Sequence, residues 1–409
     1  MRTVGAVVVV SLCLTAGCAR LPHPVRQGPP PSAKSVASPV GLSLAGEFII
    51  PTGATFEATG AAEIGGLSGC VYDAASDEVL VVSDGREPPR FYTLKVRPGG
   101  DAGGTLTVVP LSVTYVQTAH DRRDLPFVLD FEGITIAGGD VILSSEGENS
   151  DTEGEQPAVL RFDRQGRFRG SLEIPDLFLG GPADGALQGM RENEAFESLT
   201  STPDGLRLIT GAEGPLRQDD NDAGFDRPVR TRLLEMVRTG REWRPARQLV
   251  YELEPVKRPP WSGPSAISSG LVDLVALEGG RLLSLERSFV RERGGERRGV
   301  NGIRLFEIDT AGADDVSTVT SLRERPEARP VGKRLVLDVD DLRPRLGPEL
   351  QTLENFEAMC EGPRFADGGR SLLLVSDNNF SANQRTAFLI FRMSLERRVA
   401  PGLQTGPTP

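Results

Sequence analysis

The chain has 409 residues and a formal net charge of −11 at pH 7, with 25% of its residues charged. This charge argues against a general nucleic-acid binder, because such proteins present a basic surface to the phosphates. With 47 glycines and 31 prolines, the composition is that of a turn-rich β protein rather than a helical one.

Residues 1–18 are predicted to be an export signal. Arg2 supplies a basic start, and Val4–Leu14 is an apolar segment too short to span a bilayer. The segment Leu14–Cys18 is typical of a bacterial lipobox, in which Cys18 would be acylated. Thr15 stands where leucine is usual, so ordinary signal cleavage beside an incidental cysteine is the alternative. We expect a membrane-anchored lipoprotein of the cell envelope, on its periplasmic or outer-surface face.

Residues 19–45 carry six prolines among small polar residues, a composition typical of a disordered tether. The last segment, 396–409, has the same character and is expected to be a disordered tail. No convincing linker interrupts the chain between them. Residues 46–395 are therefore expected to form one domain, which we expect to be monomeric.

A short sequence pattern recurs along this domain. Each copy places an acid or small residue before an apolar strand, then a Gly-rich turn, then a second apolar strand that ends in Ser or Thr and an acid. The copies begin at Gly66, Phe131, Phe196, Val272 and Phe356. A hairpin repeated at this spacing is typical of a β-propeller with one copy per blade. We predict an all-β fold, a single β-propeller of six blades within a range of five to seven, with a short helix at Leu346–Glu357.

Carboxylates recur at two positions of this pattern. The first set is Glu132, Glu197, Asp273 and Glu357, and the second is Glu146, Glu213, Glu286 and Asp377. Because the first strand of each propeller blade lines the central channel, acids from several blades would converge there. Such a group cannot stay ionised and dry without a cation or an arginine, and oxygen ligands suit Ca²⁺ or Mg²⁺. The alternative is that these acids only cap backbone amides between blades.

Arginines stand beside several of these acids, namely Arg86, Arg191, Arg217 and Arg287. A guanidinium holds phosphate or carboxylate through two parallel hydrogen bonds, so these residues are candidates for binding an anionic substrate. The alternative is ordinary surface salt bridges.

Two cysteines, Cys70 and Cys360, remain in the predicted domain. They follow the first-strand pattern of the first and last repeats, which are neighbours in a closed ring. A disulfide between them that closes the ring is one testable hypothesis if the chain is exported, and two unpaired buried thiols are the other.

The chain lacks the residues that several classes of enzyme need for catalysis. His120 is the only histidine outside the predicted tether, which leaves little support for a serine hydrolase or a His-based metal site. The chain contains no G-x-S-x-G elbow, P-loop or dinucleotide fingerprint. Carboxylates, arginines and an oxygen-bound metal remain for catalysis.

The repeated segments resemble the phytase-like family described as "esterase-like activity of phytase". The matching segments are Ser83–Arg86, Pro89–Leu94, Asp130–Ile134, Asn193–Leu199, Glu213–Leu216, Leu285–Phe289 and Leu374–Phe380. The resemblance covers about Gly46 to Met393 and implies an exported bacterial propeller that hydrolyses phosphoesters or esters. The chain departs from the family's Phe-Glu-Gly-Leu phrase at Ser198 and at Val272-Asp273.

The resemblance implies roles for particular residues. Catalytic candidates that bind a cation or activate water are Glu132, Glu197 and Glu357. Metal-ligand candidates are Glu213, Glu286, Asp377 and Asn378, and substrate-binding candidates are Arg86, Arg287 and Asn379. The expected partners are a small phosphoester or ester substrate and, through the lipid anchor, a membrane. Two other functions stay open: a non-catalytic envelope protein that binds a ligand or partner, and a calcium-dependent lactonase-like propeller.

Overall fold

The computed structural model describes residues 40–60, 62–99, 105–118, 121, 129–147, 156–183, 186–259, 261, 264–292 and 299–395. The predicted signal segment, Cys18, His120 and the predicted tail from residue 396 lie outside these ranges. Within the part that the structure describes, no helix has the length and apolar character needed to cross a bilayer.

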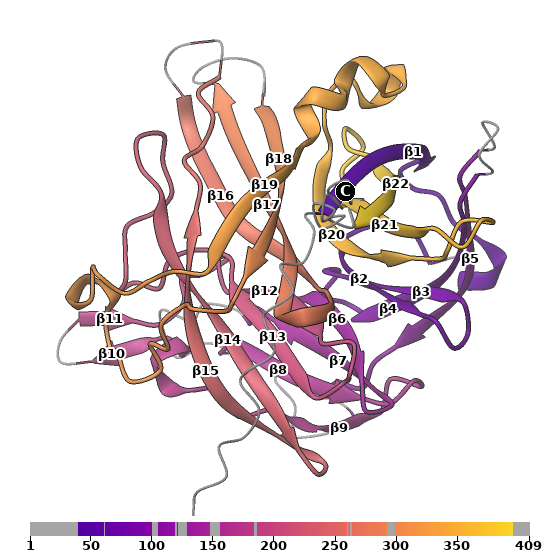
Figure 1. Ribbon diagram of the computed structural model, residues 1–409. Helices are drawn as coiled ribbons and strands as arrows, with labels where there is room; N and C mark the ends of the chain where they lie inside the picture. The colour runs from indigo at the N-terminus through magenta and orange to yellow at the C-terminus, as the bar shows by residue number, and fades with distance from the viewer. Residues whose placement is uncertain are drawn as a thin grey trace, which may run out of the picture. The chain divides into compact units, whose positions relative to one another are not determined.

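The described strands form five four-stranded antiparallel sheets, which confirms the β-propeller (Figure 1). Blade 1 contains β2 (Leu67–Asp73), β3 (Glu78–Ser83), β4 (Arg90–Arg97) and β5 (Thr107–Tyr115). Blade 2 contains β6 (Phe131–Ala137), β7 (Asp140–Ser145), β8 (Ala158–Phe162) and β9 (Phe168–Ser171). Blade 3 contains β12 (Phe196–Ser201), β13 (Arg207–Ala212), β14 (Val229–Thr239) and β15 (Glu242–Leu253). Blade 4 contains β16 (Pro264–Ala276), β17 (Arg281–Glu292), β18 (Gly299–Asp309) and β19 (Gly332–Asp338).

Blade 5 joins the two ends of the domain. Its strands are β20 (Asn355–Gly362), β21 (Arg370–Asp377), β22 (Thr386–Leu395) and β1 (Val40–Ile50), in that order. The indigo β1 lies beside the yellow β22 in Figure 1, and the two pair antiparallel along their length. Residues 40–45, predicted to be part of the tether, therefore belong to the strand that closes the ring. A short hairpin of β10 (Gly181–Ala183) and β11 (Ala186–Gln188) stands outside the blades.

Five blades lie within the expected range, one fewer than the six favoured. The long interval between the last two repeats does not hold another sheet. It is occupied by β18, β19 and short 3₁₀ turns at Leu322–Glu324, Val339–Arg345 and Pro348–Leu350. The helix predicted at Leu346–Glu357 is wrong, because Pro348 begins a single 3₁₀ turn and strand β20 already starts at Asn355.

The blades pack face to face, so their central strands are buried on both sides. All side chains of Val79–Val82 and Leu372–Val375 are buried, which explains why these strands are continuous apolar runs without alternation. Fully burying one such side chain stabilises a fold by roughly 1.5–3 kcal/mol. Tyr92 and Phe388 belong to the core cluster shared by blades 1 and 5.

The innermost strand of every blade contains a β-bulge, which lies near the start of the strand in blades 1, 2, 3 and 5 and in the middle of β16 in blade 4. The irregular pairing falls between Leu67/Gly69, Phe131/Ile134, Phe196/Ser198, Leu271/Asp273 and Phe356/Ala358. A bulge bends the strand and changes the direction of one side chain. Adjacent bulges approach closely, because a Cβ on Gly133 would lie 2.6 Å from the carbonyl oxygen of Glu197. Glycine at this position allows the inner strands to meet around the channel.

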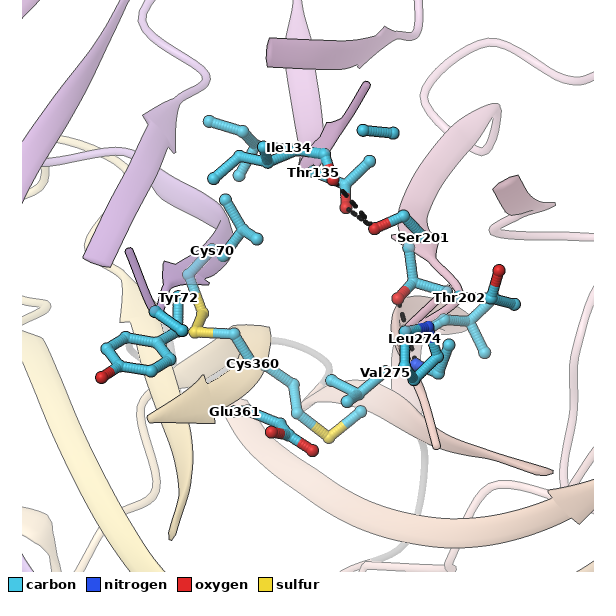
Figure 2. A pocket seen from close by; sticks show the side chains of 18 of the residues that line it. Cys70, Tyr72, Ile134, Thr135, Ser201, Thr202, Leu274, Val275, Cys360 and Glu361 are labelled. Carbon is cyan, nitrogen blue, oxygen red and sulfur yellow. Dashed lines mark hydrogen bonds between the residues drawn. A yellow bond between two sulfur atoms is a disulfide. The ribbon is translucent and has the colours of Figure 1, made fainter. Parts of the chain in front are cut away.

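Cross-links between blades surround the channel end where the inner strands finish. Cys70 in β2 and Cys360 in β20 form a disulfide with their Cα atoms 5.6 Å apart, which joins the first and last blades. Thr135 Oγ1 donates a hydrogen bond to Ser201 Oγ at 3.1 Å, from blade 2 to blade 3. Figure 2 shows these residues around a pocket of about 550 Å³.

Candidate functional site

A cavity of about 430 Å³ opens at the other end of the channel, where the inner strands begin. Its charged lining residues are Asp84, Glu132, Glu146, Glu197, Arg287, Glu357 and Asp377. The uncharged lining consists of Phe289 and five side-chain amides, from Asn193, Asn301, Asn355, Asn379 and Gln384. The cavity is therefore strongly acidic, with one arginine in its wall and amides around it.

The bulges bring three of the predicted catalytic acids into this cavity. Glu132, Glu197 and Glu357 each occupy the bulge of their inner strand, between the paired residues on either side. A second set of acids lies at the end of the second strand of blades 1, 2, 3 and 5. Each acid directly follows the residue that pairs with the inner-strand residue just before the bulge. Its acids are Asp84, Glu146, Glu213 and Asp377. The convergence of acids predicted from the repeats therefore occurs in blades 1, 2, 3 and 5.

The register excludes Asp273 from the first set. Val272 occupies the bulge in blade 4, and Asp273 lies one residue further along. The buried Asp273 carboxylate accepts hydrogen bonds from the backbone amides of Leu274 at 2.8 Å and Met359 at 2.6 Å. Asp273 therefore ties blade 4 to blade 5 and does not line the acidic cavity.

Glu286 is also displaced by one position, which corrects its assignment as a metal ligand. It pairs with Leu271, as Ser83 pairs with Leu67 in blade 1. Its carboxylate accepts a hydrogen bond from Tyr251 Oη at 2.9 Å and forms an ion pair with Lys333, between blades 3 and 4. Burial raises its pKa, while Lys333 acts in the opposite direction.

Arg287 occupies the position in blade 4 where the other blades carry an acid. Its Nη2 lies 2.7 Å from Glu357 Oε1 and 3.5 Å from Glu213 Oε1. Burial alone would lower the pKa of Arg287, but Glu357 and Glu213 raise it above its usual value. The guanidinium is therefore a fixed positive charge among the acids.

Burial and mutual repulsion favour protonation of the cavity acids. Burial first, and then Glu213, raise the pKa of Glu146 from its ordinary value near 4.5 to about 8. Burial raises the pKa of Glu213 to about 7 against the effect of Arg287, and raises that of Asp84 to about 7 with Glu357 adding to it. Burial, followed by neighbouring carboxylates, also raises the pKa of Glu132 and Glu197 well above the usual range.

The carboxylate oxygens fit a hard cation. One oxygen each from Glu146, Glu197 and Glu213 lie within 4.8 Å of one another, and so do oxygens from Asp130, Glu132 and Glu146. Oε2 of Glu197 is buried and receives no hydrogen bond from any described residue. Oxygen-only donor sets suit Ca²⁺ or Mg²⁺, and a cation would compensate this buried, unpaired atom.

The remaining predicted residues take other places. Arg86 Nη2 lies 2.5 Å from Asp130 Oδ2. Arg86 therefore contacts the cluster of acids through the carboxylate of Asp130. Asn378 is fully buried, and its Oδ1 accepts the amides of Gly66 at 3.0 Å and Phe380 at 3.1 Å. This oxygen therefore holds blade 5 to the start of blade 1 and is not among the cavity lining. Asn379 does line the cavity, and its backbone N–H donates a hydrogen bond to Asp377 Oδ1 at 2.7 Å.

Two acids of the site were missing from the predicted set. Asp84 ends the second strand of the weakest repeat, at the same position as Glu146, so the repeat itself carried the signal. Asp130 directly precedes the Phe131-Glu132 phrase and has no counterpart acid in the other repeats. Arg191, one of the candidate arginines, pairs with Asp222 at 2.8 Å.

The chain is similar to one known protein family and, at low sequence identity, to several solved structures. A model of the phytase-like family, described as "Esterase-like activity of phytase", matches residues 62–380. No curated protein sequence matches the chain significantly. Among solved structures, an endo-arabinase from Bacteroides thetaiotaomicron VPI-5482 is 12% identical with a TM-score of 0.38, covering 86% of this chain and 98% of that one. A putative 6-phosphogluconolactonase from Bacteroides uniformis ATCC 8492 is 12% identical with a TM-score of 0.28, covering 83% of each chain.

Proposed function

The chain belongs to the phytase-like family, and on that premise we propose that its acidic cavity hydrolyses phosphate esters with the help of a divalent cation. One observation carries the proposal: the carboxylates of Glu146, Glu197 and Glu213 converge beside Arg287, with Oε2 of Glu197 buried and unpaired among the described residues. This arrangement suits a cation and an anionic substrate in the same cavity.

Glu146, Glu197 and Glu213 would hold the cation, and Ca²⁺ or Mg²⁺ suits their oxygen ligands. When bound, a divalent cation supplies charge neutralisation for a phosphate group and lowers the pKa of water. Loading requires these acids to release their protons, because the ligands must be ionised. Binding is therefore expected to be weak in acid and to strengthen towards neutral pH.

The chain's own residues would orient the substrate and move a proton. Arg287 supplies a positive charge for the phosphate at the cavity wall, and its bond to Glu357 fixes that carboxylate. Glu357 lines the cavity and is placed to accept a proton from an attacking water. The amides of Asn355, Asn379 and Gln384 offer hydrogen bonds to the polar part of an ester.

We also place the protein at the cell envelope as a monomer, tethered through an acylated Cys18 that keeps the propeller near a membrane. The lipobox-like segment and the proline-rich stretch after it support this location. Mass spectrometry of the membrane fraction would detect a lipid-modified N-terminal cysteine. A soluble product cleaved elsewhere, or a Cys18→Ala variant that stays in the membrane, would contradict it.

The test is a substrate panel with chelator-treated protein, with and without added Ca²⁺ or Mg²⁺. We expect cation-dependent hydrolysis of phosphate monoesters that is lost in Glu197→Gln and Glu213→Gln. Glu242→Gln changes an exposed acid of β15 and serves as the matched control. Turnover of lactones but not phosphoesters would replace this proposal with the lactonase alternative. Ligand binding without turnover would indicate a non-catalytic binding protein.

A further inference from the structure

We infer that the acidic cavity holds a second divalent-cation site, formed by Asp130, Glu132 and Glu146, and that Glu146 bridges it to the first. The inference rests on the proposed function for the first site, at Glu146, Glu197 and Glu213. In each group one carboxylate oxygen per residue lies within 4.8 Å of the others. Glu146 is the single member common to the two groups.

The position of Glu146 explains why it can serve both groups. It follows β7 in blade 2, and its Oε1 accepts the amide of Ala195, at the start of blade 3, at 2.6 Å. Asp130 and Glu132 lie in blade 2, whereas Glu197 and Glu213 lie in blade 3. The shared carboxylate is therefore fixed at the boundary between the two halves of the acidic group.

Glu132 is the member of the second group that has no partner among the described residues. It is only 8% exposed and lines the cavity. None of the described residues donates a hydrogen bond to its carboxylate or forms an ion pair with it. A buried carboxylate with neither partner is costly unless it is protonated or binds a cation.

The acids of the two groups outnumber the arginines beside them. Each group has one acid beside an arginine: Arg86 lies 2.5 Å from Asp130, and Arg287 lies 3.5 Å from Glu213. The other acids of the groups, Glu132, Glu146 and Glu197, form no ion pair with a described residue, so positive charge from bound cations suits both groups.

Sharing a ligand makes the two sites dependent on each other. The first ion would bring Glu146 into its ionised form and fix its orientation, which prepares one ligand of the second site. Loss of Glu146 would weaken both sites, whereas loss of Glu132 or Glu197 would remove one.

Manganese binding tests the inference without using activity. Mn²⁺ is titrated into the chelator-treated full protein, and the bound ions are counted and examined by electron paramagnetic resonance. We expect two equivalents in the wild type, with a spin-coupled spectrum. Glu132→Gln should bind one equivalent with an uncoupled spectrum, Glu146→Gln should weaken both sites and abolish coupling, and Glu242→Gln should match the wild type.

One bound equivalent in the wild type would overturn the inference, as would two uncoupled ions or a Glu132→Gln variant that keeps both. Far-ultraviolet circular dichroism confirms that each variant is folded, and the wild-type spectrum tests the inference independently of any variant. A coupled pair without phosphoester turnover would contradict the proposed function only. Turnover with a single equivalent would contradict the second site only.

Discussion

The guanidinium of Arg287 in blade 4 lies 2.7 Å from the carboxylate of Glu357 in blade 5. This ion pair crosses a blade boundary and supplies the positive charge in the wall of a cavity lined by six carboxylates. Because the arginine side chain is only 14% exposed, its loss would leave buried acids without their counter-ion.

Arg287→Met is therefore expected to destabilise the metal-free protein by about 3–5 kcal/mol at pH 8, the usual cost of breaking a buried pair. The loss should be smaller at pH 5, where the acids bind protons instead. Denaturant unfolding in EDTA measures both values. Arg258→Met, which breaks an exposed pair with Asp226, is the control and should cost no more than about 1 kcal/mol. Equal losses in the two variants would show that Arg287 is not needed for charge balance.

Stability should depend on pH in an unusual direction. The pKa of Glu146 is raised to about 8 and those of Glu213 and Asp84 to about 7, so the folded protein binds more protons than the unfolded chain above about pH 4.5. Their contribution to stability is complete below the unfolded pKa values and is lost as pH rises through 7 to 8. We expect the Tm of metal-free protein to fall from pH 5 to pH 8.5. Ca²⁺ should raise the Tm more at pH 8.5 than at pH 5, and a metal-free Tm that rises over this range would contradict the burial of ionisable acids.

Asp273 and Glu197 should respond differently to loss of charge. Asp273→Asn weakens the hydrogen bonds that join blades 4 and 5 at Met359, so it should lower the free energy of unfolding by about 1–3 kcal/mol. Its cation affinity should stay near that of the wild type, because Asp273 belongs to neither group of converging carboxylates. Glu197→Gln should lose one bound cation and raise metal-free stability at pH 8. Calorimetry and unfolding of both variants check this, and the reverse pattern would show that the register assignment is wrong.

The disulfide should support the ring without affecting the acidic cavity. It links residues 290 positions apart at the opposite end of the channel. A Cys70→Ser, Cys360→Ser double variant is expected to lose about 2–5 kcal/mol of stability, the usual range for a native disulfide. Thermal unfolding with and without a reductant measures the loss in the wild type. Cation affinity at 20 °C should be unchanged, and its disappearance would show that the two ends of the channel are coupled.

Much of the fold could be predicted from the repeated sequence pattern, because each blade must bury a hairpin against its neighbours. The convergence of Glu132, Glu197 and Glu357 followed for the same reason. The assignments of Asp273 and Glu286 were wrong by one residue, since their phrases match the other repeats in letters but not in pairing. Strand register depends on contacts that the sequence does not state, and a shift of one residue turns a side chain to another face.

The position of Arg287 and the number of blades also depend on contacts that the sequence does not state. Arg287 was a predicted substrate-binding residue beside Glu286, but its occupation of an acid's position follows only once blade 4 is placed in register. The interval between the last repeats was long enough for another blade, but its length is taken up by long strands and 3₁₀ turns. Asn378 looked like an oxygen ligand by its neighbourhood, whereas the fold uses its oxygen for the amide of Gly66.

The most direct test of the account is calorimetric titration of Ca²⁺ into chelator-treated protein at pH 8, comparing wild type, Glu197→Gln and Glu242→Gln. The account predicts the same number of bound Ca²⁺ ions in the wild type and in Glu242→Gln, and one fewer in Glu197→Gln. Absence of binding in the wild type, or the same isotherm in all three proteins, would contradict the assignment of the acidic cavity as a cation site.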